Sequence, residues 1–172
     1  MTRTLLVLAC LVLFAVCLAG MRRGWRNRGR RQGAVPALPV PPSDLGPVLL
    51  APMTGLYVGT TTAGQWQDRV VAHGLGVRAD ATAELYTAGV LIERAGAEPL
   101  FVPTADLVGA GVGAGLAGKV LGPGGLLLIR WRLGAIELDT GFRADDKSLY
   151  PAWVNAIDER RATVIEQLED SA

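Results

Sequence analysis

The chain opens with an apolar run at residues 4–21, TLLVLACLVLFAVCLAGM, which contains no charged residue. Its eighteen residues, in a helix that rises about 1.5 Å per residue, would extend roughly 27 Å, close to the hydrocarbon thickness of a bilayer. The run therefore predicts a single transmembrane helix at residues 4–21. This helix would anchor the rest of the chain to the membrane.

Six arginines follow the apolar run directly, whereas only Arg3 and the amino terminus precede it. An excess of Lys and Arg marks the cytoplasmic side of a membrane helix. We therefore expect a single-pass protein of the plasma membrane, with its N-terminus outside and its C-terminal domain in the cytoplasm. The arginine cluster at residues 22–31 is expected to contact lipid headgroups through Arg22, Arg23, Arg26, Arg28, Arg30 and Arg31.

A cleaved secretory signal is the alternative interpretation of the same segment, because it also has an apolar core before small residues. Ala15, Ala19 and Gly20 are small enough for a cleavage site, and cleavage would release a secreted domain. A signal peptide carries its positive charge before the apolar core, whereas here most of the charge follows it. The charge distribution favours the uncleaved anchor.

The rest of the chain is acidic. Residues 1–31 carry seven Arg and no acid, so the remainder has ten basic and sixteen acidic residues, a net charge of −6. Nucleic acid is therefore excluded as an expected partner, because phosphate binding needs clustered cations on the folded surface. No cysteine follows Cys17, and His73 is the only histidine, so we expect no disulfide, metal or cofactor in the domain.

Residues 32–47 contain five prolines and a single charged residue. Proline interrupts helices and favours extended chain, so this segment predicts a semi-extended tether that keeps the domain near the inner leaflet. The domain itself is predicted at residues 48–168, with a short tail at 169–172.

Short apolar or alternating stretches predict about seven strands in this domain. The clearest are 126–133 and 136–142, which alternate in polarity around the two-residue turn Gly134-Ala135. The others are predicted at 48–62, 66–73, 78–86, 89–93 and 98–103.

After residue 142 the apolar period changes from two to about 3.6, which predicts one amphipathic helix. Pro151 suits its first turn, and Trp153, Ile157, Val164 and Leu168 fall on one stripe. The fold class is therefore α+β and mainly β, with the helix covering the open part of a small antiparallel sheet.

Three strings, AGK at 117–119, GGLLLIRWRLG at 124–134 and LDTGFRAD at 138–145, resemble the bacterial PH-like domains of small single-span membrane proteins. The resemblance covers about 48–168 together with the N-terminal anchor. It implies a PH-like, partly open barrel of about seven antiparallel strands, closed by the C-terminal helix. It implies a fold and a membrane location, and no activity.

Arg130 and Arg132 form the best basic pair of the domain and are a possible interaction surface. In the PH fold, headgroup recognition uses basic residues in loops, but residues 60–65 offer Gly, Thr and Gln there instead. Alternatively, the two arginines cover the solvent face of the sheet and pair with Glu137 or Asp139 across the hairpin.

Two classes of function stay open. The first is a non-enzymatic module that binds a protein partner through a sheet edge or a helix groove. The second is an enzyme or small-molecule binder that uses the glycine-rich loop at 109–118, in which GAGLAG at 113–118 matches the dinucleotide fingerprint. That fingerprint works between a strand and a helix, whereas Gly122 and Pro123 follow closely here, so a flexible loop is expected. No catalytic residue is predicted, and the interaction module is favoured.

Overall fold

The computed structural model describes residues 13, 14, 16, 18, 20, 35–116, 119, 120 and 124–169. The chain divides into two compact units, Met1–Ala34 and Val35–Ala172. In the first unit the five described residues are helical. The other residues of the predicted transmembrane segment 4–21, and the whole arginine cluster, lie outside the described residues. Among those that are described, no helix is long and apolar enough to cross a bilayer.

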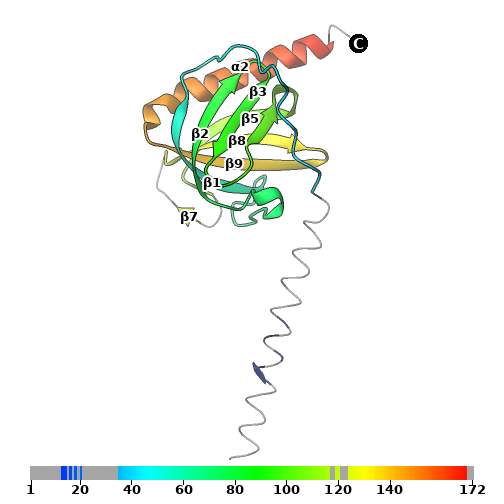
Figure 1. Ribbon diagram of the computed structural model, residues 1–172, viewed down its shortest axis with the longest axis vertical. Helices are drawn as coiled ribbons and strands as arrows, with labels where there is room; N and C mark the ends of the chain where they lie inside the picture. The colour runs from blue at the N-terminus through cyan, green and yellow to red at the C-terminus, as the bar shows by residue number, and fades with distance from the viewer. Residues whose placement is uncertain are drawn as a thin grey trace, which may run out of the picture. The chain divides into compact units, whose positions relative to one another are not determined.

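The second unit is built on one antiparallel sheet of seven strands in the order β4-β3-β2-β1-β9-β8-β5 (Figure 1). β4 and β5 are therefore the two edges, and the sheet is open. Helix α2 lies beside β5. The elements of this architecture are β1 (Met53–Thr62), β2 (Ala79–Tyr86), β3 (Gly89–Arg94), β4 (Leu100–Pro103), β5 (Leu107–Gly113), β8 (Leu126–Leu133), β9 (Ile136–Ala144) and α2 (Tyr150–Glu169).

Strands β8 and β9 confirm the hairpin predicted from the alternating pattern. Leu133 pairs with Ile136, so Gly134 and Ala135 form the turn between them. Gly134 has a φ of 60°, in the left-handed region that two-residue hairpin turns require. The inward-facing residues of the hairpin lie in the main core, namely Ile129, Trp131, Leu133, Leu138 and Phe142.

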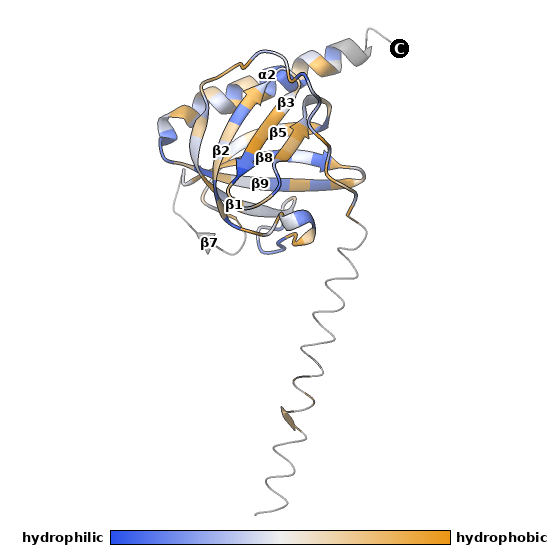
Figure 2. Cartoon of the chain, viewed as in Figure 1, coloured by the Kyte–Doolittle hydropathy of each residue, from blue (hydrophilic) through white to orange (hydrophobic). Residues whose placement is uncertain are grey.

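Two residues of the predicted stripe of helix α2, Trp153 and Ile157, pack on this core. Val164 is half-buried, and the side chain of Leu168 lies outside what the structure describes. Trp153 and Ile157 are 1% and 0% exposed and belong to the main core. Figure 2 shows hydrophilic and hydrophobic residues alternating along the helix, as expected where only one face is covered. The mainly β fold with one C-terminal helix is therefore confirmed.

The main sheet has seven strands, as predicted, but their identities differ from the prediction in two places. The strand predicted at 66–73 is wrong: these residues form turns and a 3-10 helix, η1 (Ala72–Gly74), within the β1–β2 loop. Here the chain reverses direction, and Trp66 and Val71 are exposed. Conversely, the glycine-rich segment 109–118 is predicted as a loop, but residues 109–113 form most of β5 and residues 115 and 116 form β6 (Gly115–Leu116).

The proline-rich residues are packed against the domain from Val35 onward. Val35 and Leu38 are partly buried against the main core. Further along, the Ala88 N–H donates to the Leu45 carbonyl at 3.1 Å, and the Thr87 N–H donates to the Pro47 carbonyl at 3.2 Å. From residue 35 onward, the segment predicted as a semi-extended tether packs on the domain, because its apolar residues bury surface there. We call residues 35–50 the strap.

Candidate interaction surfaces

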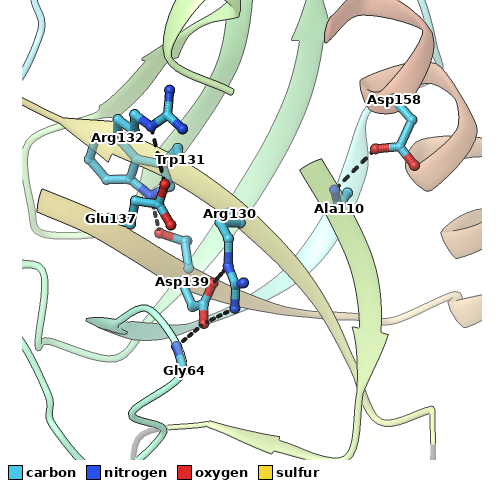
Figure 3. Close-up of polar contacts among 9 residues, drawn as sticks. Gly64, Ala110, Arg130, Trp131, Arg132, Glu137, Asp139 and Asp158 are labelled. Carbon is cyan, nitrogen blue, oxygen red and sulfur yellow. Dashed lines mark hydrogen bonds and ion pairs between the residues drawn. The ribbon is translucent and has the colours of Figure 1, made fainter. Parts of the chain in front are cut away.

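Arg130 and Arg132 are both engaged by carboxylates of the neighbouring strand (Figure 3). Arg130 lies opposite Asp139 and donates to it twice, from Nε to Oδ1 at 2.7 Å and from Nη2 to Oδ2 at 2.9 Å. Arg132 lies opposite Glu137 and donates to it at 3.2 Å. The side-chain hydrogen bond to Asp139 raises the pKa of Arg130.

These pairs match the alternative in which the arginines cover the sheet and neutralise acids across the hairpin. Asp139 is 7% exposed and also accepts a hydrogen bond from the Gly64 N–H at 3.0 Å. The exposed Arg132–Glu137 pair is worth about 0–1 kcal/mol. Each of the two cations is thus paired with a carboxylate of the neighbouring strand.

The glycine-rich segment folds over the outer face of the sheet. β6 (Gly115–Leu116) pairs with β7 (Lys119–Val120) in a small separate ribbon. Leu116 is 2% exposed and forms a second apolar cluster with Val58 and Leu126. It lies over Gly141, where an added Cβ would come within 2.6 Å of Leu116 Cδ2.

This geometry does not fit the dinucleotide fingerprint. In the described part of GAGLAG, Gly113 ends strand β5, and Gly115 and Leu116 form strand β6. The fingerprint requires a helix directly after the glycines, because its N-terminus holds the pyrophosphate. A short strand in that place offers no such helix terminus.

Strand β5 is the edge of the sheet next to helix α2. The Ala110 N–H donates to Asp158 Oδ1 of α2 at 3.4 Å (Figure 3), so this backbone group points away from β8. Backbone groups of an edge strand alternate between the paired side and the open side. The N–H and carbonyl of Val112 therefore lie on the same open side, and the Val112 side chain is 50% exposed.

A buried arginine that is absent from the predicted site residues, Arg94, connects the loops at one end of the sheet. Arg94, at the end of β3, is 5% exposed. It donates from Nε and Nη2 to the Glu98 carbonyl at 2.9 and 2.7 Å, and from Nη1 to the Gly74 carbonyl at 3.0 Å. Its guanidinium carbon lies 5.0 Å from the centre of the Tyr57 ring, within cation–π range.

In the sequence, the alternating pattern of β3 indicates that Arg94 faces inward. Val90 and Ile92 face the core, and Arg94 follows at the next inward position. An arginine at an inward position must find acceptors or reach solvent. Here backbone carbonyls accept its hydrogen bonds, so Arg94 ties the β1–β2 loop to the turn after β3.

Beside Arg94, four side chains form a buried chain of hydrogen bonds. Tyr57 donates its hydroxyl proton to the Leu75 carbonyl at 2.8 Å and contacts Thr60 Oγ1 at 2.7 Å. Thr60 Oγ1 lies 2.8 Å from Thr140 Oγ1, which also accepts the Trp131 indole N–H at 2.9 Å. Burial raises the pKa of Tyr57 to about 12.

The described residues contain no group of three or more His, Cys, Asp or Glu side chains that could hold a metal ion. In the acidic corner after β9, Asp145 accepts from the Thr54 hydroxyl at 3.0 Å and Asp146 accepts from the Ser148 N–H at 2.9 Å. His73 is exposed, and its Nε2 lies 3.3 Å from the Val35 carbonyl.

An open depression of about 470 Å³ lies where β1, β2 and β9 meet. Its polar lining consists of the carboxylates of Asp80 and Asp145, the hydroxyls of Thr54 and Thr82, and the guanidinium of Arg143. Backbone and aliphatic groups complete the lining. Among these lining residues there is no histidine or cysteine to act with a hydroxyl nucleophile.

Comparison with known families agrees with this architecture. A family model described as bacterial PH domain-like matches residues 35–158. The match spans more than half of the chain, and it begins where the second compact unit begins. No curated protein matches the chain.

Proposed function

Because the chain belongs to the bacterial PH domain-like family, we propose that it is a non-enzymatic interaction module held at the inner leaflet of the plasma membrane. In this proposal, residues 4–21 are the membrane anchor and residues 22–31 lie at the lipid headgroups. The domain binds a protein partner that adds an extended segment to strand β5.

The observation that carries the proposal is that, in the part of the chain that the structure describes, no strand pairs with the outer side of β5. Beyond the Asp158 contact at Ala110, the strand continues to Gly113 with Val112 half exposed. An unpaired edge offers backbone donors and acceptors to an incoming strand, and exposed side chains add selectivity. The opposite edge, β4, is only four residues long and ends in Pro103, which suits it less to strand addition.

The charges of the domain favour a protein over lipid or nucleic acid as the partner. Residues after the arginine cluster carry a net charge of −6, which repels phosphates. The best basic pair, Arg130 and Arg132, is neutralised by Asp139 and Glu137. A strand partner needs no excess of cations, because its affinity comes largely from main-chain hydrogen bonds.

The test is site-specific photocrosslinking of the full chain in its native membrane. A photoreactive residue at Val112 is expected to give a discrete adduct with one protein. The same residue at Val40, which is 84% exposed but lies in the strap, serves as the control and is expected to give none. Equal labelling from both positions, or no adduct from Val112, would contradict strand addition at β5.

Val112→Pro provides a second measurement. Proline removes the backbone N–H on the open side of β5 and none of the hydrogen bonds to β8. For this comparison the probe is moved to Gly111, where an added Cβ meets nothing within 4 Å. We expect it to give the adduct in the parent chain and to lose the adduct in Val112→Pro, while the melting temperature stays within a few degrees. Val112→Thr keeps the N–H and should retain the adduct.

A further inference from the structure

Helix α2 carries charged side chains along the open edge of β5. Asp158 Oδ1 accepts from the Ala110 N–H at 3.4 Å. An added Cβ on Gly109 would lie 3.5 Å from Asp158 Oδ1 and 3.9 Å from Arg161 Nη1. The helix thus advances from Asp158 to Arg161 where the strand goes back from Ala110 to Gly109. The two elements therefore run in opposite directions, and both charged side chains reach the strand at Gly109.

Two valines lie toward the other end of this boundary. Val154, one helical turn before Asp158 on the same face, lies toward the C-terminal end of β5. It is half-buried against the main core, and Val112 is 50% exposed. Val112 lies opposite the core residue Leu127, so its side chain faces the side of the sheet that α2 covers. The boundary between β5 and α2 therefore has an apolar end at the valines and a charged end at Asp158.

The backbone of β5 determines how a strand can be added here. The N–H and carbonyl of Val112 both lie on the open side, so an antiparallel partner residue opposite Val112 can exchange two hydrogen bonds with it. The partner residue two positions later lies opposite Ala110, where its carbonyl meets Asp158 instead of a free N–H. Both partner side chains point toward α2, because residues two apart share a face of the sheet.

Asp158 is exposed and retains an unused carboxylate oxygen. Its Oδ2 has no hydrogen bond or ion pair with any residue that the structure describes. The contact of Oδ1 with the Ala110 N–H is long, at 3.4 Å, and so contributes little to stabilising the charge. A carboxylate in this position repels an incoming acid and attracts a cation. The net charge of −6 after the arginine cluster acts in the same direction.

We propose that the segment added at β5 carries an apolar residue and, two positions later, a lysine or arginine. This inference rests on the strand addition of the proposed function and names the chemistry of the partner. The apolar side chain packs on Val112 and Val154, and the cation pairs with Asp158. The order is fixed, because an antiparallel strand reaches Val112 before Ala110. A second copy of β5 does not fit this description, since its sequence LVGAGVG contains no cation.

The test is photocrosslinking of the full chain, in detergent micelles, to synthetic peptides of known sequence. The photoreactive residue replaces Gly111, and the peptides are TTVTRTT, the reversed TTRTVTT and the acidic TTVTETT. We expect TTVTRTT to reach half-maximal adduct at a concentration about two- to fivefold lower than either of the other peptides. Its advantage over the acidic peptide should shrink at high salt, because the ion pair with Asp158 is exposed.

Variants of Asp158 test whether that carboxylate causes the preference. Asp158→Asn should bind TTVTRTT and TTVTETT equally, and Asp158→Lys should bind the acidic peptide better. The matched control is Glu159→Lys, which makes the same change of net charge at the next exposed position of the helix. It should keep the original preference. Unchanged melting curves show that these exposed substitutions leave the fold intact.

The outcomes separate this inference from the proposed function. If all three peptides crosslink equally and Val112→Pro abolishes their adducts, strand addition stands and the partner chemistry is refuted. If the adducts persist in Val112→Pro, the peptides bind elsewhere and the inference is overturned. If no peptide gives an adduct, the partner chemistry is refuted, whereas strand addition is decided by the adduct with the native partner in the membrane.

Discussion

At the residue scale, Tyr57 couples folding to pH. Burial raises its pKa to about 12, whereas the pKa of an unfolded tyrosine is about 10. The folded state therefore retains the phenolic proton more tightly. Its contribution to stability is complete below pH 10 and is lost as the pH rises through 12. We expect the free energy of unfolding of residues 35–172 to fall by about 2–3 kcal/mol over this window.

The measurement is urea unfolding from pH 8 to pH 12, with Tyr57→Phe as the control. The phenylalanine variant loses the bonds to Leu75 and Thr60, so it should be less stable at neutral pH by about 1–2 kcal/mol. Its decline between pH 10 and pH 12 should be correspondingly smaller. An equal decline in both proteins would assign the alkaline transition to other groups.

Gly141 leaves the space that the side chain of Leu116 occupies. Gly141→Ala would place a Cβ within 2.6 Å of Leu116 Cδ2, so we expect it to lower the free energy of unfolding by about 1–3 kcal/mol. Leu116→Ala should cost about 2–5 kcal/mol alone. The double variant should lose less than the sum, because the smaller side chain relieves the clash. Additive losses would show that the two residues do not interact.

At the scale of the element, α2 contributes to stability through a few residues of its covered face. Trp153 is 1% exposed in the main core, so Trp153→Ala should cost about 3–5 kcal/mol of unfolding free energy. Asn155→Ala, on an exposed position of the same helix, should change it by less than about 0.5 kcal/mol. Chemical denaturation of both variants checks this, and equal losses would contradict a role specific to the buried face.

At the scale of the whole molecule, the arginine imbalance predicts the orientation in the membrane. Six arginines follow the apolar run and one precedes it, so a C-terminal reporter that works only in the cytoplasm should be active. Replacing the arginine cluster with glutamines and adding arginines before residue 4 would reverse the charge difference across the apolar run. This change should reduce the activity of the reporter. Release of a mature protein with a new N-terminus near Gly20 would instead establish a cleaved signal.

Local patterns in the sequence were sufficient to predict the β8–β9 hairpin and the buried residues Trp153 and Ile157 of α2. Alternation and helical periodicity state directly which side chains face the core, and Gly134 and Pro151 mark where the elements turn or begin. The Pro-rich strap was harder to predict. Its few apolar residues form no periodic pattern, and Val35 and Leu38 pack only because the folded domain presents its apolar core to them.

Tertiary structure alone decided the remaining features. β5 is rich in glycine, which has no side chain to alternate, so its strand conformation depends on pairing with β8. Residues 66–73 look like a strand locally, but no neighbouring strand pairs with them along their length. Arg94 and Gly74 are 20 residues apart in the chain, and only the assembled sheet brings them together. Sequence patterns determine which way a side chain faces, whereas pairing between distant segments determines what it meets.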